Sequence, residues 1–167
     1  MIFTAHADGF MDIGGRRARC ALGRSGVILA ALKREGDAAT PAGTWPLRGL
    51  LYRPDRGPAP RSRLSMRALG LADGWCDDPA DVRYNRSVTL PYRASAERLW
   101  RLDHLYDLIV VLGHNDEPVV AGDGSAIFLH LAAEDYAPTQ GCIALSRPDL
   151  TALLSLACPG DALTVQA

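Results

Sequence analysis

The chain has 167 residues, a formal net charge of −1, 48% hydrophobic residues and 22% charged residues, which is typical of one globular domain spanning residues 1–167. The near balance of acidic and basic side chains argues against a nucleic-acid partner. No window supplies the ~20 apolar residues of a membrane helix, and the N-terminus lacks a signal-peptide pattern, so the chain as written predicts a cytoplasmic protein without a membrane span.

The N-terminal third predicts strands separated by turns. "ARCALG" (residues 18–23) and "GVILAAL" (26–32) predict two neighbouring strands joined through a turn at residues 24–26. "GTWPLRGLLY" (43–52) predicts an edge strand, because Pro46 lacks the amide hydrogen that a central strand donates. "PDRGPAPRSR" (54–63) predicts an open loop.

Two segments predict short amphipathic helices. In "SAERLWRLDHLY" (95–106) apolar residues recur at helical spacing, and Ser95 is a suitable N-cap. In "SRPDLTALLSLACPG" (146–160), Ser146 and Asp149 stand in capping-box-like positions, and the final Pro-Gly ends the helix. Each helix is expected to lie on a sheet.

Three segments in the C-terminal half predict strands. "DLIVVLG" (107–113) is apolar without alternation, as in a strand buried on both faces. "SAIFLHL" (125–131) alternates, and "DALTVQ" (161–166) predicts the last strand. We therefore expect a mainly β domain with two or three short helices.

Strand alternation places one histidine and one cysteine together. Successive side chains of a strand point to opposite faces, so Phe128 and His130 share one face and Cys142 and Ala144 share another. If the intervening apolar residues point into one core, His130 and Cys142 both point away from it and can meet. The residues that would face that core are Ile127, Leu129, Leu131, Ile143 and Leu145.

A histidine beside a cysteine suits nucleophilic catalysis. A thiol is mostly protonated at neutral pH, and an adjacent imidazole that takes its proton creates the reactive thiolate. Gly141 permits a sharp turn whose amides can face an oxyanion. A lone cysteine is nevertheless more often a small core residue, and a lone histidine is more often structural. From spacing alone both interpretations stay open.

Two motifs resemble a known family. "IFLH" followed by "PTQGCIAL" resembles the catalytic signature of the L,D-transpeptidase (YkuD-type) domain, in which a histidine and a loop precede Ser/Thr-x-Gly-Cys. "TPAGTWPL" (40–47) resembles the Thr-Pro-x-Gly segment that precedes this signature in such domains. The similarity spans roughly residues 18–166, and it implies a β-sandwich-like fold.

The resemblance also implies roles for individual residues. Cys142 would be the nucleophile, His130 the general base and acid, and Gly141 with Cys142 the source of oxyanion donors, while Thr139 would brace the turn. The implied reaction is acyl transfer on peptidoglycan stem peptides through a Cys thioester. An amine acceptor gives cross-linking, and water gives L,D-carboxypeptidase activity. The resemblance implies no metal or organic cofactor, and a place in the periplasm or cell envelope.

The motif departs from the family at two positions. Many members have histidine where this chain has Gln140, and Ala144 replaces a frequent Arg or Asn. Gln140 is expected to affect substrate contact, and Ala144 the way in which a substrate carboxylate is held. The departures also leave open an alternative, a non-catalytic module that binds peptidoglycan peptides on the same fold.

Two loops supply candidate substrate-binding residues. In "WCDDPADVRYN" (75–85), Tyr84 and Asn85 are residue types that hydrogen-bond peptide backbones, and Asp77 or Asp78 is placed to meet a substrate amine. In "LGHND" (112–116), His114 and Asn115 follow a buried strand, where binding groups are common. A solvated turn and a structural histidine are the corresponding alternatives.

The spacing of the four cysteines indicates no metal or redox motif. None of Cys20, Cys76, Cys142 and Cys158 forms a CxxC pair, and too few histidine and cysteine ligands cluster for a metal site. The oligomeric state cannot be read from the sequence.

Overall fold

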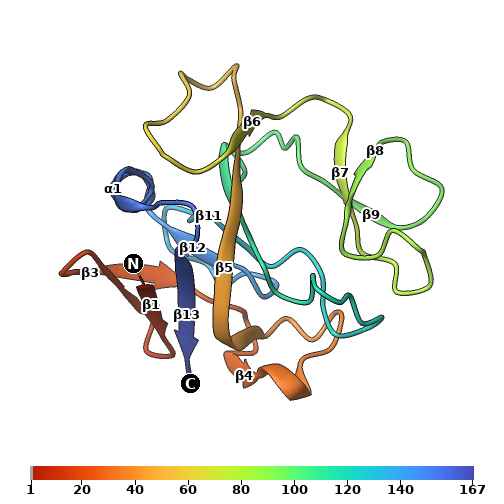
Figure 1. Cartoon of the computed structure of the whole chain (residues 1–167), viewed down its shortest axis with the longest axis horizontal. Helices are drawn as coiled ribbons and strands as arrows, with labels where there is room; N and C mark the ends of the chain where they lie inside the picture. Colours follow the sequence, from red (N-terminus) through yellow and green to blue (C-terminus); the bar gives the residue numbers. More distant parts are fainter. Residues whose placement is uncertain (1) are drawn as a thin grey trace.

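In the computed structural model, which describes residues 2–167, most strands join one large sheet that curls until its ends meet (Figure 1). The strands are β1 (Ile2–His6), β2 (Phe10–Ile13), β3 (Arg16–Ala21), β4 (Val27–Leu29), β5 (Thr40–Tyr52), β6 (Met66–Ala68), β7 (Asp73–Cys76), β8 (Ser87–Thr89), β9 (Ala96–Arg98), β10 (Leu108–Leu112), β11 (Phe128–Leu131), β12 (Ile143–Leu145) and β13 (Ala162–Gln166). Among the described residues there is one α-helix, α1 (Arg147–Leu156), and one 3-10 turn, η1 (Ala30–Leu32).

The large sheet closes because β5 pairs with two neighbours in succession. The strand order is β10-β11-β12-β3-β2-β1-β13-β5-β4, and the second half of β5 pairs back onto β10. A closed sheet encloses the main core, so the expectation of a β-sandwich-like fold is corrected in this respect. The small antiparallel sheet β8-β7-β9 lies outside it and, with the neighbouring loops, faces β10 and β11 (Figure 1).

Strand β5 is central, not an edge strand as Pro46 suggested. Residues 43–46 pair with β13, and Leu47–Tyr52 pair with β10. Pro46 stands at the junction of these two stretches, and its carbonyl accepts a hydrogen bond from the Gly113 amide at 2.9 Å. The missing amide hydrogen therefore falls where the partner changes, which a proline tolerates.

Strands β3 and β4 are not neighbours, contrary to the prediction. β3 pairs with β2 and β12, whereas β4 pairs with β5. The predicted turn is present, with the Gly26 amide donating to the Gly23 carbonyl at 2.8 Å. The turn diverts the chain to another part of the sheet because β12 already occupies the free edge of β3.

The helix predicted over residues 95–106 is absent. Ala96–Arg98 form β9, which pairs with β7. Leu99 is fully buried, the Arg53 guanidinium lies 3.7 Å from the Trp100 ring centre, and Leu102 is 95% exposed. These apolar residues reach different neighbours instead of one common stripe, so tertiary contacts override their helical spacing.

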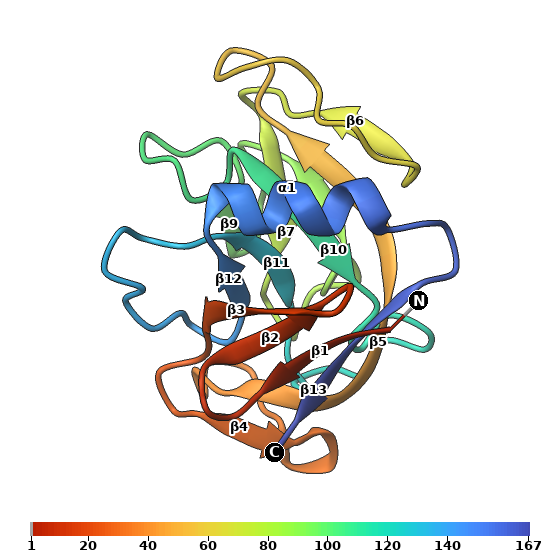
Figure 2. The same ribbon diagram turned by 90° about the vertical axis from the view of Figure 1, so that its left-hand side faces the viewer.

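The C-terminal helix forms as predicted and closes one side of the core. The Ser146 hydroxyl accepts a hydrogen bond from the Asp149 amide at 3.2 Å, which caps α1. Leu150, Leu153 and Leu154 are buried, and α1 contacts β11 and β2 (Figure 2). The main core is thereby sealed on the side of α1, and the outer face of β11 and β12 remains for a second cluster that includes Phe128 and Cys142.

Candidate functional site

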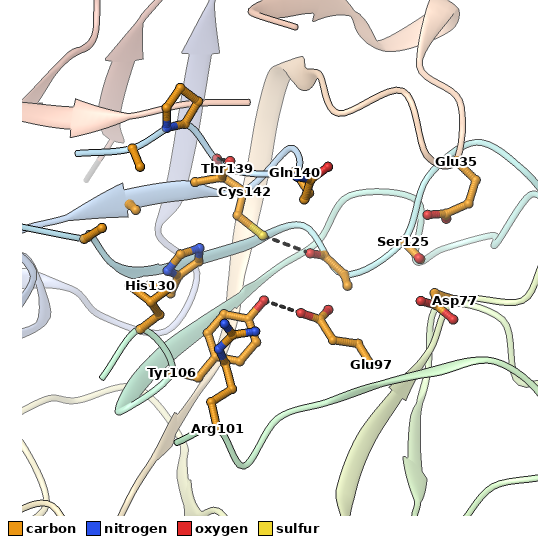
Figure 3. A pocket seen from close by; sticks show the side chains of 16 residues that line it. Glu35, Asp77, Glu97, Arg101, Tyr106, Ser125, His130, Thr139, Gln140 and Cys142 are labelled. Carbon is orange, nitrogen blue, oxygen red and sulfur yellow. Dashed lines mark hydrogen bonds between the residues drawn. The ribbon is translucent and has the colours of Figure 1, made fainter. Parts of the chain in front are cut away.

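A pocket of about 460 Å³ lies on the outer face of β11 and β12 (Figure 3). Its floor includes His130, Cys142 and Ala144, and its walls come from the turn before β12, from β9 and the chain that follows it, and from loops near residues 35, 77 and 125. The polar lining side chains are Glu35, Asp77, Glu97, Arg101, Tyr106, Ser125, His130, Thr139, Gln140 and Cys142. Segments far apart in the sequence therefore build the pocket around one thiol.

The strand register places His130 and Cys142 on the same face of the sheet. β11 and β12 are parallel, with Leu129 opposite Ile143 and His130 opposite Ala144. Leu129 and Ile143 belong to the main core, so His130 and the residue before Ile143, Cys142, face outward. The alternation predicted from the sequence is confirmed.

The turn before β12 is held by Thr139. Its hydroxyl donates to the Cys142 carbonyl at 2.6 Å and accepts a hydrogen bond from the Gly141 amide at 3.1 Å. The Thr139 amide donates to the Leu22 carbonyl at 2.9 Å, which ties the turn to the chain that follows β3. Thr139 thus fixes the position from which Cys142 enters the pocket.

Gly141 occupies a position that excludes a side chain. Its φ is +129°, and a Cβ there would lie 2.9 Å from the Ala39 carbonyl oxygen. Because both the backbone conformation and a backbone contact oppose a side chain, we expect Gly141→Ala to cost about 2–4 kcal/mol of unfolding free energy. Thermal unfolding should show a Tm lower by about 5 °C or more.

The matched control for Gly141→Ala is Gly57→Ala. Gly57 has φ +154° in an exposed loop, and a Cβ there meets nothing within 4 Å. The control should therefore report the backbone effect without the contact. Equal Tm values for the two variants would contradict a tight turn at Gly141.

The Cys142 thiol is neutral in its surroundings. The residue is 8% exposed; Sγ donates to the Ala126 carbonyl at 3.2 Å and accepts a hydrogen bond from the Phe128 amide at 3.4 Å. Burial, together with the negative charge of Glu97, raises the pKa of this thiol to about 12. A base is therefore required to make it nucleophilic at neutral pH.

His130 is held as a neutral imidazole. Its Nδ1 lies 2.8 Å from the Leu131 carbonyl oxygen, which can only accept, so Nδ1 is assigned the proton and Nε2 keeps a lone pair. Burial lowers the pKa of His130 to about 4. No direct hydrogen bond joins His130 and Cys142 within residues 2–167; the two share a face and a pocket, and the thiol proton points to Ala126.

Two further residues at the site carried no signal in the sequence. The Tyr106 ring packs edge-on against His130, with ring centres 5.1 Å apart, and its hydroxyl donates to Glu97. Burial raises the pKa of both side chains. Tyr106 and Glu97 lie in a segment expected to be helical, where neither belonged to a motif.

The predicted substrate-binding residues divide into two groups. Thr139 and Gln140 line the pocket, and Gln140 accepts a hydrogen bond from Arg24 at 3.3 Å. Tyr84, Asn85, His114 and Asn115 do not line it, and the first three are buried. Of the two acidic residues predicted to meet a substrate amine, Asp77 lines the pocket and Asp78 does not.

The second group supports the pocket wall from behind. The Asn85 amide donates to the carbonyls of His114 and Asn115, and its oxygen accepts from the amide of Ala126, a pocket-lining residue, at 3.1 Å. The Tyr84 hydroxyl donates to Glu35. A role for these four residues in substrate binding remains a proposal, and the structure connects them to the site through such contacts.

Comparisons with known proteins agree with the mainly β fold. The sequence model of the YkuD family, the L,D-transpeptidase catalytic domain, matches residues 10–165. The structure of L,D-transpeptidase 3 from Mycobacterium tuberculosis resembles this chain with a TM-score of 0.50 and 14% identity, over 99% of this chain and 60% of that chain. An L,D-transpeptidase from Mycobacterium smegmatis has a TM-score of 0.44 and 16% identity, over 99% of this chain and 58% of that chain.

At 14% identity, the likeness to L,D-transpeptidase 3 shows the fold alone. The chain spans about 60% of the length of the first of these structures. No curated protein matches the chain. Among residues 2–167 there is no helix of the length and apolar character needed to cross a membrane.

Proposed function

Because the chain belongs to the YkuD family of L,D-transpeptidase catalytic domains, we propose that it is a cysteine acyltransferase acting on peptidoglycan stem peptides through a thioester on Cys142. The family match covers residues 10–165 and supports a transpeptidase of the cell wall. The roles of Cys142 as nucleophile and His130 as base are supported by the geometry of the pocket.

The observation that carries the proposal is the pairing of a thiol with a proton acceptor in one pocket. Cys142 and His130 share the outer face of two adjacent parallel strands and both line the cavity. The Leu131 carbonyl holds the Nδ1 proton, which leaves Nε2 as the basic nitrogen. A neutral thiol and a neutral imidazole are the reactant state of general-base catalysis.

Acylation then proceeds in two steps, attack on the carbonyl carbon and collapse of the tetrahedral intermediate. His130 Nε2 takes the Cys142 proton as Sγ attacks the carbonyl carbon of the donor peptide bond, and the carbonyl oxygen becomes an oxyanion. The Gly141 amide already bonds to Thr139, which leaves the Cys142 amide as the proposed oxyanion donor. Collapse breaks the C–N bond, and the imidazolium returns the proton to the leaving amine.

The second half-reaction reverses these roles. An amine or a water molecule attacks the thioester, and His130 removes its proton. The C–S bond breaks, and the Cys142 thiol regains a proton from His130. An amine acceptor yields a cross-link and water yields a shortened stem peptide, so one site supports both transpeptidation and L,D-carboxypeptidase activity. Because the substrate lies outside the membrane, we place the reaction in the cell envelope.

Product analysis with a defined muropeptide tests the proposal. Purified protein incubated with a disaccharide tetrapeptide should release the terminal D-amino acid and form either a cross-linked dimer or a disaccharide tripeptide, as detected by mass spectrometry. Binding of the muropeptide without either product would instead favour a non-catalytic binding module.

A further inference from the structure

One end of the pocket is acidic. Glu35, Asp77 and Glu97 line the same cavity as Cys142, and they come from the chain after η1, the chain after β7, and β9 (Figure 3). Their charges act on one another, because the negative charges of Asp77 and Glu35 contribute, after burial, to the raised pKa of Glu97. Three carboxylates thus share one partly buried space.

None of these carboxylates forms an ion pair within residues 2–167, although the positive charge of Arg101 partly offsets the effect of burial on the pKa of Glu97. Glu35 and Glu97 each accept a hydrogen bond from a neutral phenol, those of Tyr84 and Tyr106. Arg101 lines the pocket, but its guanidinium is bound at two points by Asp103, with N–O distances of 2.9 and 2.6 Å. The buried Lys33 pairs with Asp37. Within residues 2–167, no Lys, Arg or His forms an ion pair with any of the three acids.

Two buried polar atoms of pocket-lining residues, Asp77 Oδ1 and Ser125 Oγ, also lack hydrogen-bond partners in the described part of the chain. The Asp77 Oδ1 atom is buried and accepts no hydrogen bond from the described part of the chain. Ser125 is 8% exposed and lines the pocket beside Glu35 in Figure 3. Its hydroxyl makes no hydrogen bond of normal geometry, although it lies near the Tyr84 hydroxyl. Such atoms are costly unless a ligand completes their hydrogen bonds.

The arrangement suits an organic cation better than a metal ion. A metal requires several ligand atoms converging on one point. No group of three or more His, Cys, Asp or Glu side chains in the described residues is placed to hold a metal ion. An ammonium group donates only three hydrogen bonds, so it needs fewer converging acceptor atoms than a metal ion, and a carboxylate and a hydroxyl can both serve as acceptors.

We propose that Glu35, Asp77 and Glu97, with Ser125, form a subsite for a side-chain ammonium of the peptide substrate. The subsite rests on the proposed function for the identity of the peptide, and its chemistry follows from three pocket carboxylates that form no ion pair within residues 2–167. A charged ammonium would donate three hydrogen bonds among these groups, and its acceptors would include the unpartnered Asp77 Oδ1 and Ser125 hydroxyl.

Occupation of this subsite would also activate the nucleophile. The negative charge of Glu97 contributes to the raised pKa of the Cys142 thiol. A positive charge beside Glu97 offsets that effect, so transfer of the thiol proton to His130 becomes easier when the ammonium is bound. The subsite would therefore couple recognition of the correct side chain to formation of the thiolate.

Binding to an inactive protein tests the subsite separately from catalysis. In Cys142→Ala protein the peptide cannot be consumed, and its Kd is measured by calorimetry. A stem tetrapeptide with a free side-chain amine should bind about tenfold or more tightly than the same peptide with that amine acetylated. Equal affinities would overturn the subsite, whether or not the wild-type protein forms products.

Variants that remove one negative charge each test which carboxylates cause the preference for the free amine. Glu35→Gln and Asp77→Asn, each added to Cys142→Ala, should reduce the preference for the free amine to about threefold or less. Glu117→Gln makes the same chemical change at an exposed residue away from the pocket and should keep the full preference. A preference that survives both pocket variants would overturn the assignment of these residues.

Reaction products distinguish whether the ammonium belongs to the donor or the acceptor. In Asp77→Asn protein with an intact Cys142, loss of both hydrolysis and transfer supports a donor ammonium. Loss of transfer alone supports an acceptor that binds as an ammonium and gives its proton to His130 before the neutral amine attacks the thioester. Either result supports the subsite, and unchanged rates of both reactions contradict it. A wild-type protein that forms no product would refute the proposed reaction, while the binding measurement would still decide the subsite.

Discussion

Replacing Cys142 by alanine is expected to abolish acyl-enzyme formation and to lower both product rates by about 10³-fold or more. The reason is that Sγ forms the bond to the substrate carbonyl, and no other thiol lines the pocket within residues 2–167. The loss of one buried sulfur atom should cost about 1 kcal/mol of stability, so the variant should remain folded.

A carbapenem offers a direct measurement of this loss. Attack of a thiolate on the strained β-lactam carbonyl breaks the ring C–N bond and retains every atom of the drug. Intact-mass spectrometry should therefore show a gain of one whole carbapenem on the wild-type protein and none on Cys142→Ala.

Cys158 provides the matched control. It is more exposed than Cys142, but it follows α1 and does not line the pocket. If reactivity reflects activation by the site, Cys158→Ala should acquire the adduct at the wild-type rate. An adduct that persists in Cys142→Ala and disappears in Cys158→Ala would refute the assignment of the nucleophile.

The second large effect is expected at His130. His130→Asn keeps an N–H donor close to the Leu131 carbonyl and removes the basic nitrogen, so acylation should slow by about 10²–10⁴-fold at neutral pH. His6→Asn changes a histidine of β1 that pairs with Asp12 and does not line the pocket, and it should acylate at the wild-type rate.

The pH dependence separates a base from a structural residue. Burial lowers the pKa of His130 to about 4, so the imidazole is neutral at pH 7, and acylation should fall only as the pH drops toward that value. In His130→Asn the acidic limb should disappear, and the rate should instead rise with thiolate formation toward the thiol pKa of about 12. Parallel pH profiles for the two proteins would mean that His130 supports the pocket without moving the proton.

Folding and acid stability provide an independent check of the same shift. A histidine whose folded pKa lies below its ordinary value of 6.5 binds its proton better in the unfolded chain. Its contribution to stability is therefore complete above pH 6.5 and is lost as the pH falls toward 4. His130→Asn should accordingly lose less stability than the wild type between these pH values.

Local sequence signals predicted several elements around the proposed site. The unbroken apolar run predicted β10, the alternation of residues 127–131 predicted which side chains of β11 enter the core, and the Ser146–Asp149 cap predicted the start of α1. These predictions succeeded because periodicity and capping depend on residues a few positions apart. The same signals placed His130 and Cys142 on one face before any pairing partner was known.

Pairing across long sequence distances was not predictable in this way. Pro46 suggested an edge strand, yet β5 pairs first with β13 and then with β10, and the proline falls where one of these partners replaces the other. Residues 95–106 have helical spacing, yet β7 captures Ala96–Arg98 as a strand, and Leu102 is left in solvent. A local pattern cannot reveal a competing partner that comes from another part of the chain.

The sequence by itself determined the proposed chemistry. It placed a thiol and an imidazole on the same face of two strands, with a glycine turn before the thiol, and it identified the family of the chain. Only the tertiary structure decided the surroundings that tune this chemistry. Glu35, Asp77 and Glu97 have no common motif, and they meet because loops from different parts of the closed sheet and the small sheet converge over β11 and β12. Burial is a property of that convergence; it lowers the pKa of His130, and together with the negative charge of Glu97 it raises the pKa of Cys142.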